Sequence, residues 1–480
     1  MLFKNLAKDS IIYGGADFVS KSISFFIFPI VASVLSPQNF GALELILSTT
    51  LLLGYIINCG LNNSVQRFYW DSHITDQVAI VTSGFISQIT FGTIAVACGL
   101  IFIPLILYFP KVNDLGIGWF TLMSALLLMT LSQWSQFILD VIRLHFRPWR
   151  FFGLVMFSRI STLFFSVIAV VSFDLGINGL LGTQFLVLLA VLPLGIFSIK
   201  KDLNFFKFSL KKAKQLINFG YPFIFTGIAF WLFSSMDRWM LAYMCSVEEV
   251  GIYSIAFRFS SVVAFLSAAF GQAWSPVAIK IRRDYPESYR TIYGQILLFI
   301  TFIMLVAGGG AALFAGETIN LILPGQYLSS ALPLIILNFG VILQSTQHVT
   351  AIGISLENKT FLFARLAWLT AVVNFLGNCF MIPLFGAEGA ATTTLISFAV
   401  LTFSQFFLTQ HLHRLDIDWK RFIGLLLIAC FVLVVSVNYL SFEISVYLTT
   451  AKIIFAIFCF FIGFKLIPIG SIKNYDIVKS

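Results

Sequence analysis

The sequence has few charged residues for its length. Charged residues make up 11% of its 480 positions, whereas hydrophobic residues make up 59% and phenylalanine alone accounts for 55 positions. A soluble domain usually carries about 25% charged residues, because water must solvate its surface. Apolar runs recur here from Ile11 to Ile467, and each is long enough to cross a hydrocarbon core of about 30 Å. The composition excludes a soluble globular protein and predicts an all-α polytopic membrane protein.

Several motifs that carry chemistry are also missing. The sequence contains no GxxxxGK[ST] phosphate-binding loop, no HExxH zinc motif and no Ser/His/Asp set in a loop long enough to assemble a site. Its six cysteines form no CxxC pair, so neither a disulfide framework nor a metal site is expected. No cleavable signal peptide is expected either, because the first apolar run exceeds the usual length of about 7–15 residues. We therefore predict neither an enzyme nor a metal centre.

The apolar runs predict about fourteen transmembrane helices. A spanning segment must satisfy its own backbone hydrogen bonds, and barrel strands would be shorter and would alternate in polarity. The predicted spans are residues 11–35, 40–62, 78–108, 116–142, 149–172, 176–199, 216–242, 250–278, 291–315, 329–353, 360–382, 386–410, 422–440 and 444–467.

The cations between these spans predict the orientation of the chain. With the N-terminus in the cytoplasm, 23 of the 30 lysines and arginines fall in inner loops and tails. The outer loops hold only Lys111, together with seven acids. This asymmetry follows the positive-inside rule, so both termini are predicted to be cytoplasmic in a multi-pass protein of the bacterial inner membrane. The net charge of +9 therefore sets topology and does not predict nucleic-acid binding.

Two pairs of segments match at the same spacing of 210 residues. Residues 35–43 (LSPQNFGAL) parallel residues 245–253 (CSVEEVGIY), and residues 176–183 (GINGLLGT) parallel residues 386–393 (GAEGAATT). Chance similarity of glycine-containing turns at helix starts is the alternative. A repeat of six spans predicts two lobes of the same orientation, as in some transporters. The predicted domains are an N-lobe (1–199), a basic cytoplasmic connector (200–215), a C-lobe (216–410) and two extra helices with a cytoplasmic tail (411–480).

The same segments resemble a known family. Residues 9–44 (DSIIYGGADFVSKSISFFIFPIVASVLSPQNFGALE) and residues 374–393 (NFLGNCFMIPLFGAEGAATT) are similar to polysaccharide exporters of the multidrug/oligosaccharidyl-lipid/polysaccharide superfamily. The likeness covers roughly residues 9–410. It implies a MATE-like fold and a flippase for undecaprenyl-pyrophosphate-linked oligosaccharide units, such as O-antigen units, without enzymatic activity. It also implies the pathway's polymerase and chain-length regulator as partners. Its glycines and prolines are mostly architectural, so they identify the fold better than the cargo.

Cations within the predicted spans are candidates for binding the cargo. An ionisable group at the bilayer centre costs about 2.5–3.5 kcal/mol on insertion scales, so such groups usually face a cavity or a partner. A cationic cavity suits a pyrophosphate-linked head group. The candidates are Lys21, Arg258, Arg159 and Arg238. Snorkelling to the interface favours anchoring for Arg365, and Lys452 is expected in an inter-helix or lipid-side role.

Two acids within the spans are candidates for pairing or for ion coupling. Asp17 lies one helical turn before Lys21, in the order that favours an ion pair, so a structural pair and a cavity role are both open. Glu44 is a candidate for binding H⁺ or Na⁺, although interfacial solvation is the simpler expectation. Arg238 directly follows Asp237, and adjacent helical residues do not face one another, so this acid is not expected to neutralise it. The driving force is either an ion gradient or the membrane potential.

Two other functions compete with the flippase. An O-antigen polymerase or ligase needs a sizeable outer loop for its chemistry, but the longest predicted outer loop has about thirteen residues (316–328). A multidrug/ion antiporter of the same superfamily would be expected to have acids dominating its cavity, whereas cations dominate among the intramembrane charges here.

Overall fold

A computed structural model describes residues 2–71, 74–108, 117–357, 361–442 and 445–468. Thirteen helical stretches in these residues are long and apolar enough to cross a membrane. One of them, α17 (Phe361–Leu412), has 52 residues and consists of two helices joined at Gly386, whose backbone is not helical (φ 53°, ψ −129°). At about 1.5 Å per residue, 52 residues are more than twice what one crossing needs. The fourteen predicted crossings are therefore accounted for, and the all-α fold is confirmed for the described residues.

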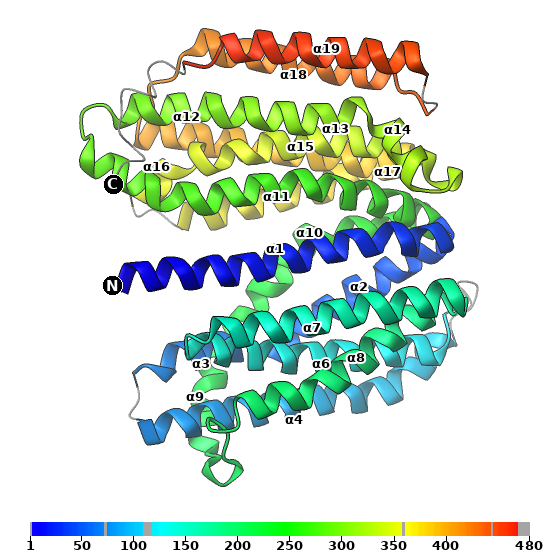
Figure 1. Ribbon diagram of the computed structural model, residues 1–480, viewed down its shortest axis with the longest axis vertical. Coiled ribbons are helices and arrows are strands. Elements are labelled where there is room, and N and C mark those ends of the chain that lie inside the picture. Colours follow the sequence, from blue (N-terminus) through cyan, green and yellow to red (C-terminus); the bar gives the residue numbers. More distant parts are fainter. Residues whose placement is uncertain (1, 72–73, 109–116, 358–360, 443–444, 469–480) are drawn as a thin grey trace. The chain divides into compact units, whose positions relative to one another are not determined.

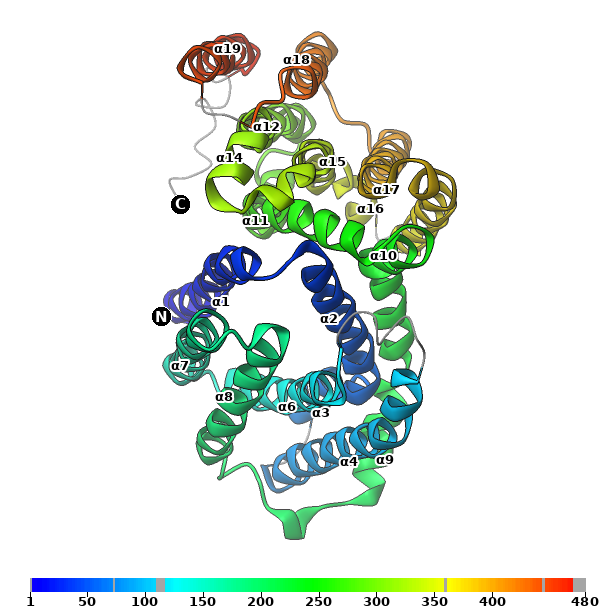
Figure 2. The ribbon, with the colours of Figure 1, turned by 90° about the vertical axis from the view of Figure 1, so that its right-hand side faces the viewer.

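The chain forms two compact units, Met1–Met236 and Asp237–Ser480, which are described separately (Figure 1). The helices of the first unit are α1 (Leu2–Val34), α2 (Pro37–Asn58), α3 (Leu61–Tyr69), α4 (Ile74–Leu107), α6 (Trp119–Leu144), α7 (Pro148–Val167), the π-helical turn η1 (Ile168–Ser172), α8 (Gly176–Ser198), η2 (Phe205–Lys207), α9 (Leu210–Gly220) and the first part of α10 (Pro222–Met244). Within this unit α6 lies between α8 and α4 (Figure 2), and α1 packs along α7.

The second unit continues from α10. Its helices are α11 (Val247–Asp284), α12 (Tyr289–Met304), the π-helical turn η3 (Leu305–Gly309), α13 (Gly310–Leu313), α14 (Ala315–Ile322), η4 (Gly325–Ser330), α15 (Ala331–Thr350), α16 (Ile352–Leu356), α17, α18 (Trp419–Asn438) and α19 (Val446–Lys465). Here α15 packs against α11, α12 and α17, and α18 packs against α15 and α13.

Local geometry repeats at both pairs of matched segments. Ser36 caps α2 by accepting the amide of Asn39 at 3.2 Å, and Ser246 caps α11 by accepting the amide of Glu249 at 3.2 Å. Gly176 and Gly386 adopt φ of 52° and 53°, a left-handed conformation that side chains rarely adopt. The two matched pairs thus share a capping partner and a backbone angle, as a repeat predicts, and the parallel orientation of the two lobes stays a prediction.

The basic connector is fastened to the first unit. The amide of Asn204 donates to Thr82 Oγ1 at 3.0 Å, the amide of Ser209 donates to Ser83 Oγ at 3.1 Å, and Lys212 Nζ lies 2.5 Å from an oxygen of Asp76. By its contacts the connector belongs with α4, and the two compact units divide within α10 rather than at the connector. The domain limits drawn from the repeat remain a prediction.

Large apolar side chains cover much of the outside of the helices. Examples are Phe102, Phe164, Phe197 and Phe458, each more than half exposed. Soluble monomers rarely expose contiguous apolar patches of this kind, whereas lipid solvates them readily. The exposed surface thus agrees with the apolar composition of the spans.

Candidate substrate cavity in the first unit

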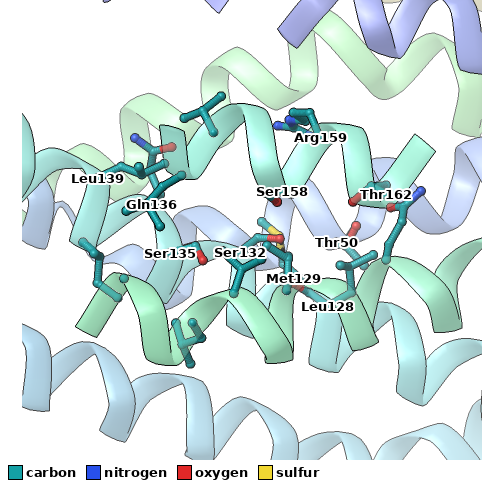
Figure 3. Close-up of a pocket in the computed structure, with 18 of the residues that line it drawn as sticks. Thr50, Leu128, Met129, Ser132, Ser135, Gln136, Leu139, Ser158, Arg159 and Thr162 are labelled. Carbon is teal, nitrogen blue, oxygen red and sulfur yellow. Dashed lines mark hydrogen bonds between the residues drawn. The ribbon is translucent and has the colours of Figure 1, made fainter. Parts of the chain in front are cut away.

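A cavity of about 310 Å³ opens among α2, α6, α7 and α8 of the first unit (Figure 3). Its hydroxyl and amide lining residues are Thr50, Ser132, Ser135, Gln136, Ser158, Thr162 and Gln184. Arg159 is the one charged residue among the described lining residues. The remaining lining is aliphatic, including Leu128, Met129 and Leu139. The hydroxyl and amide side chains can therefore exchange hydrogen bonds with sugar hydroxyls, and Arg159 can donate to an anionic group.

Helical spacing places these polar groups on one side of each helix. Ser132 and Ser135 on α6, and Ser158 and Thr162 on α7, are three or four residues apart and so share a face of their helix. In Figure 3 the labelled hydroxyls of α6, α7 and Thr50 gather in the space between the helices. These hydroxyls, together with the intramembrane Arg159, give the cavity a polar lining.

A buried carboxylate supports one wall of the cavity. Asp140 accepts hydrogen bonds from Gln136 Nε2 at 3.0 Å and from Asn62 Nδ2 at 2.7 Å, and Arg143 NH1 lies 3.5 Å away. Because Gln136 lines the cavity, this carboxylate fixes the direction of its amide. The sequence analysis missed Asp140, although its place in the last two turns of the fourth predicted span was a usable signal.

The structure separates the predicted cationic candidates. Arg159 lines the cavity, and Lys21 is exposed on α1, the helix that packs along α7. Arg238 and Arg258 belong to the second unit, where Arg258 is half-buried on α11. The cargo-binding role of all four remains a prediction, and Arg159 alone is placed at a described cavity of the first unit.

Arg238 is enclosed by partners of its own unit. Its Nε donates to Ser254 Oγ at 3.3 Å, its guanidinium lies 4.8 Å from the centre of the Phe257 ring, and its NH1 is 3.5 Å from Asp237 Oδ1. Contrary to the prediction, Asp237 does face Arg238, because the long arginine side chain folds back to the carboxylate of the preceding residue. Tyr253 OH also donates to Asp237, at 2.5 Å. These contacts give Arg238 a structural role within the second unit.

Of the two acidic candidates, the structure describes the side chain of Glu44 but not that of Asp17. The side chain of Asp17 lies outside the described residues, so its pairing with Lys21 remains a prediction. Glu44 is only 8% exposed. Simple solvation at the interface was therefore the wrong expectation for Glu44, because the neighbouring helices remove its carboxyl group from solvent.

Other ionisable groups within the spans are also partnered. Lys452 of α19 forms a buried ion pair with Glu317 of α14, which fulfils the inter-helix role expected of it. His348 Nε2 lies 3.2 Å from Ser267 Oγ. In the described part of the chain, no group of three or more His, Cys, Asp or Glu residues is placed to hold a metal ion.

Comparison with known proteins identifies the family. A family model described as "Polysaccharide biosynthesis protein" matches residues 6–282, more than half of the chain. The chain belongs to this family. The predicted N-lobe from residue 6 onward, the connector and the first two helices of the predicted C-lobe fall within the match, which includes every lining residue of the cavity.

Two relatives come from the archaeon Haloferax volcanii. The "Probable low-salt glycan biosynthesis flippase Agl15" is 24% identical over 304 residues, which cover 63% of this chain and 64% of the relative. The "Probable flippase AglR" is 25% identical over 171 residues, which cover 34% of this chain and 35% of the relative. The chain thus matches less than two thirds of the length of either relative.

Two solved structures share the fold. The "Lipid II flippase MurJ, inward closed conformation" superposes with a TM-score of 0.73 at 14% identity, covering 95% of this chain and 98% of that one. An "Inward-facing conformation of a multidrug resistance MATE family transporter" superposes with a TM-score of 0.62 at 13% identity, covering 82% and 94%. The predicted MATE-like fold is confirmed.

Proposed function

We propose that the chain is a flippase that moves lipid-linked oligosaccharides between the leaflets of a membrane. The observation that carries this proposal is the cavity of the first unit, which combines seven hydroxyl or amide side chains with one guanidinium among membrane-spanning helices. Sugar hydroxyls that leave water need replacement hydrogen bonds, and an arginine guanidinium pairs well with phosphate oxygens. Membership of a polysaccharide biosynthesis family supports the same cargo class.

The finer features of the cargo follow from the sequence resemblance. The carrier is proposed to be undecaprenyl pyrophosphate in the inner membrane of a bacterium, and the glycan an O-antigen or similar surface polysaccharide unit. The head group would enter a polar, cationic cavity while the prenyl tail stays in lipid. Movement would occur by alternating access of the two lobes, as in other transporters built from repeats.

The driving force is proposed to be H⁺, Na⁺ or the membrane potential, with Asp17 and Glu44 as candidate ion-binding residues. A polymerase and a chain-length regulator of the same pathway are the proposed partners. Both proposals rest on the sequence.

A drug/ion antiporter is the alternative that the fold allows, because a MATE transporter shares it. A cationic drug needs acidic partners, whereas the described lining of the cavity contains Arg159 and no acid. The cavity therefore favours an anionic cargo. A polymerase or ligase is favoured less, since the predicted outer segment between η3 and α15 is short and helical.

Disrupting the gene and locating the lipid-linked sugars tests the proposal. A flippase predicts complete repeat units that accumulate on the cytoplasmic leaflet, protected from externally added glycan-binding reagents. Unpolymerised units exposed on the outer leaflet would instead favour the polymerase. Unchanged glycan with increased drug sensitivity would favour the antiporter.

A further inference from the structure

The basic connector between α8 and α9 exposes a cluster of apolar side chains. Residues 200–215 read KKDLNFFKFSLKKAKQ. Phe205, Phe206 and Leu210 are each more than 60% exposed, and Phe208 is 41% exposed. The connector lies outside the predicted spans, so the apolar length of a crossing helix does not account for these rings. A cluster of exposed aromatic side chains indicates a partner or an apolar medium that covers them.

Hydrogen bonds hold this part of the connector against α4. The amide of Asn204 donates to Thr82 Oγ1 at 3.0 Å, and the amide of Ser209 donates to Ser83 Oγ at 3.1 Å. Both hydroxyl-bearing side chains are buried. The chain between these two bonds therefore follows α4. It lies on the outer side of α4, away from the other helices of the first unit (Figure 1, Figure 2).

These bonds place the connector near the edge of the hydrocarbon core. The third predicted span begins at residue 78, so Thr82 and Ser83 lie about 6–8 Å beyond its start at 1.5 Å per residue. At the end of α8, Lys200 Nζ lies 4.1 Å from the centre of the exposed Phe197 ring. Aromatic rings and lysines whose stems lie along apolar surface are typical of the membrane–water interface. The exposed rings of the connector are therefore expected at the level of the lipid head groups.

The charges of the connector favour an anionic partner. Residues 200–215 contain six lysines and one acid, Asp202, whose Oδ1 lies 3.0 Å from His145 Nε2. Lys212 is paired with Asp76 of α4. Six lysines against these two acids leave a surplus of four positive charges. The lysines that are exposed are Lys200, Lys201, Lys207, Lys211 and Lys214.

Helix α9 turns its lysines away from the protein. Ala213, Leu216 and Gly220 are three or four residues apart, and all three are buried. The carbonyl of Leu216 also accepts from Ser64 Oγ at 2.8 Å, which holds this face of α9 against α3. Lys211 and Lys214 share another face of the helix and are exposed. The packing of α9 thus leaves its cations available to a ligand outside the protein.

We propose that the connector, residues 200–215, is a docking surface for anionic phospholipids of the adjacent leaflet. The rings of Phe205, Phe206 and Phe208 enter the hydrated head-group region, and the exposed lysines bind lipid phosphates. The level of the rings beside α4 favours lipid over an acidic segment of another protein. This surface is separate from the cavity of the first unit and does not depend on the proposed transport.

The depth of a spin label at residue 206 tests the docking surface. The full-length Phe206→Cys protein, with the native cysteines replaced, is labelled and reconstituted into vesicles of phosphatidylglycerol or of phosphatidylcholine. Power saturation measures the ratio of label accessibility to oxygen and to a polar nickel chelate. In phosphatidylglycerol this ratio should be about threefold or more above that of Glu287→Cys, an exposed residue of another predicted inner loop. In phosphatidylcholine the ratio at residue 206 should be lower by about twofold or more.

Charge reversal tests the part of the lysines. Lys207→Glu/Lys211→Glu brings the surplus of four positive charges to zero, so it should reduce the ratio in phosphatidylglycerol to the value found in phosphatidylcholine. Arg414→Glu/Lys420→Glu reverses two exposed cations of another predicted inner segment and is the matched control. It should leave the ratio at residue 206 unchanged. The unfolding temperature in detergent verifies that each variant is folded.

Three results would overturn the proposal. The first is a ratio at residue 206 in phosphatidylglycerol equal to that of Glu287→Cys. The second is a high ratio that is the same in both lipids and in the charge-reversed variant, which would show that the rings insert without recognition of anionic lipid. The third is a label that stays accessible to the nickel chelate in phosphatidylglycerol and is protected only when polyglutamate is added, which would assign the surface to an acidic protein segment.

Discussion

One pair of buried charges joins two helices of the second unit. Lys452 and Glu317 pair within the second unit, and their side chains are 2% and 8% exposed. Removing one member of such a pair leaves the other charge buried without compensation. This pair therefore holds α19 to α14 mainly because removing one partner costs free energy, and less because the two charges attract one another.

Lys452→Ala should destabilise the protein by about 3 kcal/mol, because Glu317 would be left unpaired and buried. Thermal unfolding in detergent measures the change. Glu317→Gln/Lys452→Met should recover most of the loss, since both charges are then gone. Lys465→Ala, an exposed lysine of the same helix, is the control. If Lys452→Ala unfolds at the wild-type temperature, the ion pair has no structural role.

Arg159 is the charged residue of the proposed substrate cavity. Arg159→Ala should reduce export of the lipid-linked glycan about tenfold or more, as expected for loss of a charged hydrogen bond of about 1.5–3 kcal/mol. Cell-surface glycan and protein level are measured together. Arg150→Ala, an exposed arginine in the first turn of α7, should leave export unchanged. Normal export by Arg159→Ala at normal expression would exclude Arg159 from cargo binding.

At the scale of the element, the break within α17 depends on one glycine and one carboxylate. Gly386 has φ 53°, and the amide of the next residue, Ala387, donates to Glu249 Oε2 at 2.7 Å. The carboxylate of α11 thus satisfies the first amide of the second helix of α17. A Cβ on Gly386 would lie 2.6 Å from the same Glu249 oxygen.

Gly386→Ala should therefore destabilise the protein by about 1–2 kcal/mol through its backbone conformation alone, with a further loss from displaced Glu249. Gly176→Ala has the same φ but meets nothing closer than 3.9 Å, so it should cost less. Gly310→Ala, in helical backbone with open space around it, is the control and should be neutral or slightly stabilising. Unfolding temperatures of the three variants give the order, and a Gly386→Ala protein as stable as Gly310→Ala would contradict it.

Histidine–carboxylate contacts join the ends of corresponding helices in the two units. His145, after α6, lies 3.0 Å from Asp202, which follows α8. In the second unit His413, after α17, lies 3.4 Å from Glu357, which follows α16. In the first unit the histidine follows the fourth predicted span and the acid follows the sixth. In the second unit the acid follows the fourth predicted span of the C-lobe and the histidine follows the sixth.

The His413 contact predicts a pH dependence. Burial lowers the pKa of His413, while Glu357 opposes the shift and Arg282 and Arg290 add to it. The unfolded chain then binds a proton more readily than the folded protein does, so stability falls as the pH drops below about 6.5. Unfolding temperatures between pH 7.5 and 5.5 should decrease less for His413→Gln than for the wild type. An equal slope in both proteins would contradict this assignment.

At the scale of the whole molecule, the distribution of cations predicts which loops face the cytoplasm. Phe206, in η2 of the basic connector, is fully exposed, and Gln326 in η4 lies in a predicted outer loop. In intact cells, Gln326→Cys should react with a membrane-impermeant maleimide, whereas Phe206→Cys should react only after the membrane is opened. Each of the two substitutions is made in a variant in which the six native cysteines have been replaced. The reverse pattern would show that the chain has the opposite orientation.

The sequence alone determined the features that depend on the type of residue. Apolar length predicted the fourteen crossings, and the 210-residue spacing paired Ser36 with Ser246 and Gly176 with Gly386, residue types that favour a side-chain cap and a left-handed backbone respectively. Ionisable residues within the spans could be identified in the same way, because the free-energy cost of placing such a group in lipid does not depend on the fold.

Only the tertiary structure decided which of those residues share a site. Arg159 lies with hydroxyls of α2 and α6 at one cavity, Arg238 is enclosed by Asp237 and Ser254, and Asp140 accepts a hydrogen bond from Asn62 of α3 as well as from Gln136 of its own helix. These outcomes depend on how helices distant in sequence pack and on how long side chains bend, and neither is encoded in hydrophobicity or spacing.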